Sequence, residues 1–93
     1  MIIEKTEIFN KWLKKLKDYN AKARINIRIR RIEEGNLGDV KSVGNGISEI
    51  RIDYGPGYRL YLTKRGQTII LLLCGGDKTT QEKDIQQAKE MIK

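Results

Sequence analysis

Three cationic side chains in the second half of this sequence have the types and spacing needed to act on a phosphate ester. Arg51 and Arg59 lie in two consecutive apolar segments around Gly55-Pro56-Gly57, and Lys78 follows the glycine pair Gly75-Gly76. A guanidinium fork stabilises the charge of a pentacovalent phosphate, and a lysine adds charge or donates a proton. The glycines before Lys78 would let the backbone of a ligand approach closely. The three cations are therefore candidate catalytic residues.

Two neighbours of the arginines, Glu49 and Tyr61, are candidates for supporting roles. Side-chain alternation places both on the arginine side, where Tyr61 suits stacking on a base or proton transfer. Glu49 is a candidate general base if nearby arginines keep it ionised. The ordinary alternative is a solvated cross-strand ladder in which Asp53 and Glu49 neutralise the arginines. Composition alone favours that ladder.

The chain is basic and lacks groups on which many enzymes depend. Its 19 Lys and Arg against 12 Asp and Glu give a formal net charge of +7, which favours nucleic acid or an acidic protein as partner. It contains no histidine, which excludes His-pair ribonuclease chemistry, Ser-His hydrolysis and ordinary zinc sites within this chain. We expect neither a metal nor another cofactor.

Length and apolar patterning predict a cytoplasmic, single-domain protein. The 93 residues suit one domain, and Cys74 is the single cysteine, so no disulfide can form within the chain. No apolar run approaches the roughly 18 residues that a membrane span needs. We therefore expect no association with membranes.

Three consecutive strands, residues 48–53, 58–63 and 68–74, are predicted to carry the candidate site as an antiparallel meander. A three-residue loop at 55–57 would pair Asp53 with Arg59 and Arg51 with Tyr61. The apolar face toward the helices then holds Ile50, Ile52, Leu60 and Leu62. The polar, exposed face holds Glu49, Arg51, Asp53, Arg59, Tyr61 and Thr63. The unbroken apolar run 69–74 predicts a central strand covered on both sides.

The N-terminal half is predicted to begin with a strand over residues 1–5 and a helix capped by Thr6. Helical spacing brings together Ile8, Trp12, Leu13 and Leu16, with Trp12 in the core, and the helix should end near residues 18–20. Residues 21–34 fit a half-buried strand or a helix almost equally, since isoleucines alternate with polar residues but also share one helical face. Gly35 suits the left-handed residue after a helix end.

Two segments flank the predicted meander. Residues 35–46 are rich in glycine and read as a connection anchored by Leu37 and Val40, because no Gly-Lys-Ser/Thr ending supports a phosphate-binding loop. At the other end, Thr79 and Glu82 have the spacing of a capping box, followed by a helix with Ile85, Ala88 and Met91 or Ile92 on one face.

A series of short motifs runs through nearly the whole chain. In order they are Trp12-Leu13, Ala23-Arg24-Ile25, Gly35-Asn36-Leu37-Gly38-Asp39, Gly46 to Ile52, Gly55-Pro56-Gly57-Tyr58-Arg59-Leu60-Tyr61 and Leu72 to Lys78. This set resembles the HigB-like branch of the RelE/ParE toxin superfamily, the killer proteins of bacterial addiction modules. The resemblance implies an α+β fold of order β-α-α-β-β-β-α, an antiparallel meander packed against helices. It also implies that residues 21–34 are helical and that the first strand lies at the sheet edge.

The resemblance further implies a type II toxin that cuts mRNA in the ribosomal A site, driving the ribose 2′-hydroxyl onto the adjacent phosphate without metal. A helix-turn-helix antitoxin would hold it inactive and link it to operator DNA. By motif, Arg59 would stabilise the phosphate, Arg51 matches a cation on the preceding strand, and Lys78 replaces an arginine. Independently of the resemblance, charge makes Lys64, Arg65, Arg28 and Arg31 candidates for further RNA contacts, and the ordinary alternative for the basic run at residues 28–31 is a solvated helix face.

The match departs from the family pattern at two positions. Glu49 and Asp84 stand where such toxins can carry a lysine and a tyrosine, which leaves the general acid and base unassigned. Two other functions stay open: a ParE-like inhibitor that binds DNA gyrase without catalysis, and a non-toxic nucleic-acid binder with a degenerate site.

Overall fold

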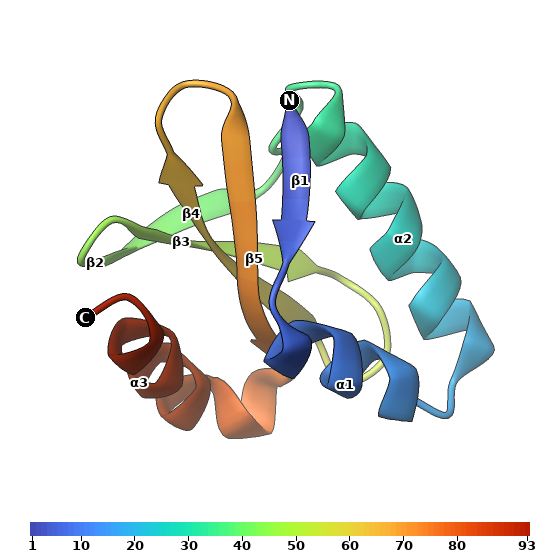
Figure 1. Cartoon of the computed structure of the whole chain (residues 1–93). Helices are drawn as coiled ribbons and strands as arrows, with labels where there is room; N and C mark the ends of the chain where they lie inside the picture. Colours follow the sequence, from blue (N-terminus) through green and yellow to red (C-terminus); the bar gives the residue numbers. More distant parts are fainter.

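A mixed five-stranded sheet organises the protein, with helices on both of its faces (Figure 1). The computed structural model describes residues 1–93. The strand order is β1-β5-β4-β3-β2, with β1 parallel to β5 and the other pairs antiparallel. The elements are β1 (Ile2–Lys5), α1 (Glu7–Lys15), α2 (Tyr19–Glu33), β2 (Val40–Gly44), β3 (Ile47–Ile52), β4 (Tyr58–Arg65), β5 (Ile69–Gly76), a 3₁₀ turn (Lys78–Thr80) and α3 (Gln81–Met91). The predicted α+β class and the edge position of the first strand are confirmed.

Helix α1 begins as predicted but ends early. The Thr6 hydroxyl accepts the amide of Phe9 at 3.0 Å, and the helix closes at Lys15 rather than near residues 18–20. Asp18 instead caps the next helix by accepting two backbone amides. Trp12, Leu13 and Leu16 pack on the core as predicted, but Ile8 is exposed and Phe9 is buried in its place, so the prediction is wrong at Ile8 alone.

Helix α2 resolves the ambiguity of residues 21–34. Its core side chains are Ala21, Ile25, Ile29 and Ile32, all buried, whereas Ile27 is 48% exposed. This is the burial pattern of one helical face, not of an alternating strand. Gly35 ends the helix at φ 92°, and its amide reaches the carbonyl of Ile32 at 2.9 Å. The predicted helix and its glycine end are confirmed.

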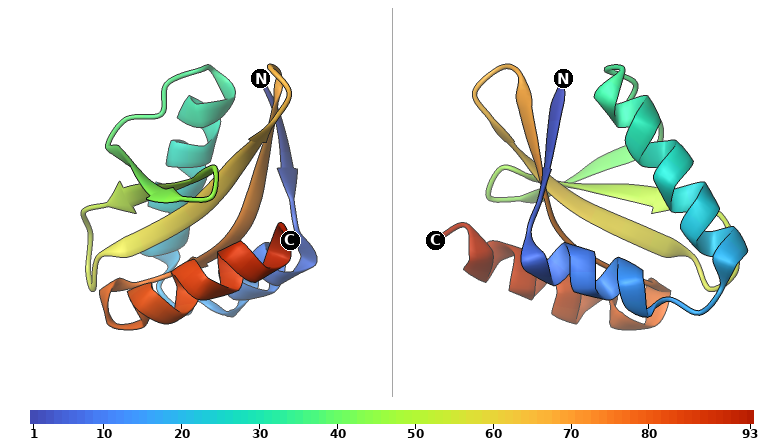
Figure 2. Two further views of the ribbon diagram at one scale, coloured as in Figure 1. Left: turned by 90° about the vertical axis from the view of Figure 1, so that its left-hand side faces the viewer. Right: turned by 45° about the vertical axis from the view of Figure 1, so that its right-hand side comes forward.

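The sheet separates two apolar clusters. On one face α1 and α2 pack on Ile50, Ile52, Leu60 and Leu62, as predicted; on the other, α3 packs on Ile47, Tyr61, Leu71 and Leu73. Figure 2 shows α3 and α2 approaching the sheet from different sides. The central strand β5 is covered on both faces, and a bulge between its pairings at Leu72 and Cys74 places Leu73 and Cys74 in the same cluster.

The meander keeps the predicted faces but not the predicted register. Arg51 lies opposite Arg59, and Glu49 lies opposite Tyr61. Five residues, from Asp53 to Gly57, connect the last paired residues of β3 and β4, not three. The two additional residues shift the pairing by one full side-chain period, so each side chain stays on its predicted face while its partner changes.

The segment 35–46 contains a strand that the sequence did not predict. Residues Val40 to Gly44 pair with β3 as the edge strand β2. Four of its five residues are exposed, so it lacks the apolar alternation by which strands are recognised. Leu37 packs on the core as expected, but Val40 is exposed and is no anchor.

The start of α3 uses different capping residues from those predicted. Asp77 and Thr80 form a capping box around the 3₁₀ turn, and the Asp77 carboxylate also accepts the Thr79 amide at 2.8 Å. Thr79 and Glu82 form no such pair, because a 3₁₀ turn precedes the helix. None of the three helices is long and apolar enough to span a bilayer.

Candidate active site

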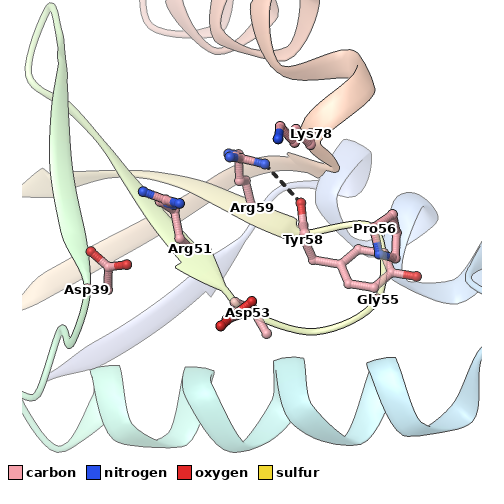
Figure 3. A pocket seen from close by; sticks show the side chains of 10 residues that line it. Asp39, Arg51, Asp53, Gly55, Pro56, Tyr58, Arg59 and Lys78 are labelled. Carbon is pink, nitrogen blue, oxygen red and sulfur yellow. Dashed lines mark hydrogen bonds between the residues drawn. The ribbon is translucent and has the colours of Figure 1, made fainter.

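A hollow of about 370 Å³ opens where β3, β4 and the 3₁₀ turn meet. Its lining includes the three predicted cations, Arg51, Arg59 and Lys78, together with Asp39, Asp53 and the Gly55-Pro56-Gly57 turn. Figure 3 shows Arg51 and Arg59 projecting from neighbouring strands, with Lys78 beyond Arg59 and Asp39 beyond Arg51. The fold therefore brings together cations that lie 27 positions apart in the chain, from Arg51 to Lys78.

The two arginines face each other across β3 and β4 without full neutralisation. Arg51 is exposed and forms no ion pair, and Asp53 bridges neither arginine. Like charges directly opposite each other destabilise a sheet. The ladder that composition favoured is thus present only in part, through the contact of Glu49 with Arg59. The hollow itself is lined by three cations and two carboxylates, Asp39 and Asp53, and neither of these carboxylates forms an ion pair with Arg51, Arg59 or Lys78.

Arg59 is held in place from two directions. Its Nη1 donates to the carbonyl of Gly57 at 3.0 Å, and its Nε lies 3.7 Å from Oε2 of Glu49, too far for a hydrogen bond. This Nε is buried without a hydrogen-bond partner. A guanidinium with few internal hydrogen bonds, at the wall of a hollow, retains donors for an anionic ligand.

Glu49 sits under α3 and not on an exposed face. It is 1% exposed, and its Oε2 accepts the Tyr61 hydroxyl at 3.1 Å and Nε2 of Gln81 at 2.9 Å. The carboxylate does not line the hollow. The expectation of an accessible Glu49 is wrong, because α3 covers this half of the polar face, and in this arrangement Glu49 cannot reach a substrate as a general base.

Tyr61 is likewise buried, at 0% exposure, against the expectation of a surface residue. Burial, together with the charge and hydrogen bond of Glu49, raises the pKa of its hydroxyl well above the usual range. The phenol therefore stays protonated and donates to Glu49. No base can stack on its ring in this conformation.

The glycine pair before Lys78 serves internal packing. A Cβ on Gly75 would overlap the Trp12 ring, and one on Gly76 would overlap the Asp84 carboxylate. The predicted access of a ligand backbone at these glycines is wrong, since both are buried by side chains of α1 and α3. Lys78 itself is exposed, and its Cβ lies near Gly57, which places it at the rim of the hollow.

The remaining predicted RNA contacts lie outside this hollow. Lys64 and Arg65 are exposed at the far end of β4, five and six residues from Arg59, which is about 17 to 20 Å along a strand. Arg28 and Arg31 line a second hollow on α2. No group of three or more His, Cys, Asp and Glu side chains is arranged to hold a metal ion.

Sequence reasoning missed three contributors. Asp39 lines the hollow through the unpredicted edge pairing, where its carbonyl accepts the Arg51 amide at 3.2 Å. The Gly57 carbonyl and the Gln81 amide also act on the site, through Arg59 and Glu49. Asp39 and Gly57 each lie in a motif noted in the sequence, Gly35 to Asp39 and Gly55 to Tyr61, whereas Gln81 had no such signal.

Comparison with solved structures defines the class of fold. A double arginine-to-alanine variant of Escherichia coli RelE in the free state superposes with a TM-score of 0.78 at 16% identity, covering 99% of this chain and 97% of that one. The E. coli RelBE toxin-antitoxin complex matches with a TM-score of 0.69 at 16% identity over 82% of this chain and 94% of that one. The protein has a RelE-like fold, as the resemblance implied.

Sequence comparison gives the family. The chain belongs to the phage derived protein Gp49-like family (DUF891), whose profile matches residues 11–93. An uncharacterized protein of Haemophilus influenzae is 58% identical over 87 residues, which is 94% of this chain and 88% of that protein.

Proposed function

We propose that this protein is the toxin of a type II toxin-antitoxin module and that it cleaves mRNA on the ribosome. The observation that carries the proposal is the opposed pair Arg51 and Arg59, with Lys78 beside it, lining an open hollow in a RelE-like fold. An arrangement that weakens the sheet through charge repulsion is expected where a phosphate is bound.

The proposed reaction is attack of a ribose 2′-hydroxyl on the adjacent phosphate. A bond forms between the 2′-oxygen and phosphorus, the bond from phosphorus to the 5′-oxygen breaks, and a 2′,3′-cyclic phosphate and a 5′-hydroxyl result. Arg59 and Arg51 stabilise the charge of the pentacovalent intermediate. Lys78 adds positive charge or protonates the departing 5′-oxygen.

The general base in this scheme is a carboxylate that reaches the hollow. Asp39 and Asp53 line it, whereas Glu49 does not. Both carboxylates are therefore placed to accept the 2′-hydroxyl proton in this scheme. Asp39→Asn and Asp53→Asn, measured separately, assign the role to the aspartate whose replacement removes most of the cleavage.

The hollow opens to solvent, since Arg51 and Lys78 in its lining are exposed, and this suits a substrate that a larger partner holds in position. In the proposed function the ribosome holds the mRNA codon, and the toxin supplies the cations. E. coli RelE forms a complex with its antitoxin. By analogy, a helix-turn-helix antitoxin neutralises this chain in the cytoplasm, and operator DNA is bound only through that antitoxin.

The experiment is induction of the chain in cells, followed by primer extension on translated mRNA and pulse labelling. We expect new 5′ ends within codons and an early fall in protein synthesis. Arg59→Ala should abolish both, while Arg30→Ala, an exposed arginine of α2 outside both hollows, should not. An early fall in DNA synthesis with intact mRNA would instead identify a gyrase inhibitor, and growth arrest by Arg59→Ala would remove the arginine from catalysis.

A further inference from the structure

A second hollow, of about 240 Å³, lies beside the first on the surface of α2. It shares Ile52 and Asp53 with the first hollow, so the two form neighbouring depressions on one surface. Its other lining residues are Arg24, Ile27, Arg28 and Arg31. The three arginines are spaced by four and three residues and therefore share one helical face, with Ile27 three residues after Arg24.

Two of these arginines are already oriented by the fold. The Arg24 guanidinium lies over the Tyr54 ring, 4.4 Å from its centroid. Nη2 of Arg28 lies 3.5 Å from the Leu37 carbonyl, and its guanidinium packs so closely on Gly38 that any Cβ there would overlap it. Side chains fixed before binding lose less rotamer entropy when a ligand arrives.

The cluster carries charge that the protein itself does not neutralise. None of Arg24, Arg28 and Arg31 forms an ion pair, although Asp53 stands at the boundary between the two hollows. Like charges on adjacent turns weaken a helix. Between the arginines, Ile27 is 48% exposed and provides an apolar surface beside the guanidinium groups.

We propose that this second hollow binds a backbone phosphate of the RNA strand whose scissile phosphate occupies the first hollow. The inference rests on the proposed function. Guanidinium forks match phosphate oxygens, and Ile27 contacts the adjoining sugar or base. Continuity with the cations Arg51, Arg59 and Lys78 favours a strand of RNA over an acidic protein segment, because one strand can follow both hollows.

The test measures binding without cleavage. A fluorescent nine-nucleotide 2′-O-methyl RNA, which lacks the attacking hydroxyl, is titrated with the full chain at several salt concentrations. Arg24→Ala/Arg28→Ala should weaken binding about 10-fold at low salt and reduce the salt slope by about 0.7 for each phosphate that the variant no longer neutralises. Arg24→Lys/Arg28→Lys, which keeps charge but not the fork, should fall between wild type and the alanine pair.

The matched control is Lys14→Ala/Lys15→Ala, which removes the same charge from exposed positions outside both hollows. Equal weakening by both alanine pairs would overturn the site in favour of general charge attraction. Unchanged RNA affinity together with abolished binding of polyglutamate would overturn it in favour of an acidic protein. Circular dichroism confirms folding of each variant. Because the RNA cannot be cleaved, a failure of the proposed nuclease activity in cells is distinguishable from a failure of this site.

Discussion

At the scale of single residues, Glu49 is the position where the role expected from the sequence differs most from the role seen in the structure. The sequence presents it as a carboxylate beside two arginines, which suggests acid-base chemistry. In the structure, Oε2 of Glu49 accepts hydrogen bonds from the Tyr61 hydroxyl and the Gln81 side-chain amide, and it also faces Nε of Arg59. Helix α3 covers this part of the sheet. A buried carboxylate shared by several donors fixes the position of those donors. Glu49 thus orients Arg59 from behind the hollow.

Glu49→Gln is expected to destabilise the fold by about 1–3 kcal/mol, because a hydrogen-bonded buried charge is replaced next to Arg59. Urea unfolding at pH 7 measures the change. Glu90→Gln is the control, since the Glu90 side chain is 65% exposed in a pair with Lys93 and should shift stability by less than about 0.5 kcal/mol. Equal stability of the Glu49 variant and wild type would contradict a structural role for this carboxylate.

Asp77 and Asp84 have pKa values shifted in opposite directions by their surroundings. Hydrogen bonds from Thr79 lower the pKa of Asp77, whereas burial raises the pKa of Asp84 despite a hydrogen bond from Thr80. The ionised form of Asp77 therefore stabilises the fold above its unfolded pKa. The ionised form of Asp84 opposes folding once the pH rises through its raised pKa.

Asp84→Asn is accordingly expected to raise the free energy of unfolding at pH 7, and the gain should disappear as the pH falls below the ordinary aspartate range. Asn keeps an acceptor for Thr80. Asp77→Asn should do the reverse, losing stability at pH 7 and converging with wild type in acid. Urea titrations from pH 3 to 7 test both, and parallel stability curves for wild type and either variant would refute that assignment.

At the scale of elements, the end of β5 explains why two glycines precede Lys78. Successive residues of a strand point to opposite faces, so Gly75 meets Trp12 of α1 and Gly76 meets Asp84 of α3. Trp12 also contacts Phe9 and Tyr58, with ring centroids 5.7 and 6.3 Å away. The glycines let helices from both layers approach one strand, which places the 3₁₀ turn and Lys78 at the hollow.

Gly75→Ala is expected to destabilise the fold by about 1–3 kcal/mol, because its methyl group would displace the Trp12 ring in a packed core. Thermal unfolding, with Trp12 fluorescence as the probe, measures the effect. Gly66→Asn is the control, since Gly66 lies in open space at φ 66°, a conformation that Asn tolerates. A Gly75 variant as stable as the Gly66 variant would show that the Trp12 contact is not tight.

At the scale of the whole molecule, both faces of the sheet carry an apolar cluster, but only one face is partly open. The face toward α1 and α2 holds the cluster that includes Ile50 and Leu60, while the face toward α3 is buried at Tyr61 and open at Arg51. The candidate site lies at the border where α3 stops covering the polar face. The net charge of +7 adds long-range attraction for an anionic partner.

This attraction predicts strong salt dependence for the whole chain. Binding of single-stranded RNA should weaken by at least about 10-fold between 50 and 200 mM salt, since phosphate contacts release condensed counterions. Fluorescence anisotropy of the same nine-nucleotide RNA measures it. Affinity that does not change with salt would show that the cations of the two hollows do not meet phosphates.

The sequence by itself determined the features that depend on local periodicity and backbone chemistry. The alternation of side chains along the strands predicted the apolar face of Ile50, Ile52, Leu60 and Leu62, and Gly35 predicted the end of α2. The grouping of Arg51 and Arg59 on one side of the meander followed from the same alternation. These properties depend on residues that are close together in the chain, so they can be predicted from the sequence of one protein.

Only the tertiary structure decided which polar residues reach solvent and which partners they meet. The alternation of side chains along a strand does not reveal that α3 covers Glu49 and Tyr61 while Arg51 stays exposed. Nor does it reveal that five residues, not three, separate the paired ends of β3 and β4. The edge strand β2, which begins directly after Asp39, lacks the apolar alternation by which a strand is recognised. Burial and ion pairing depend on elements far apart in the chain, and those contacts form only when the layers pack.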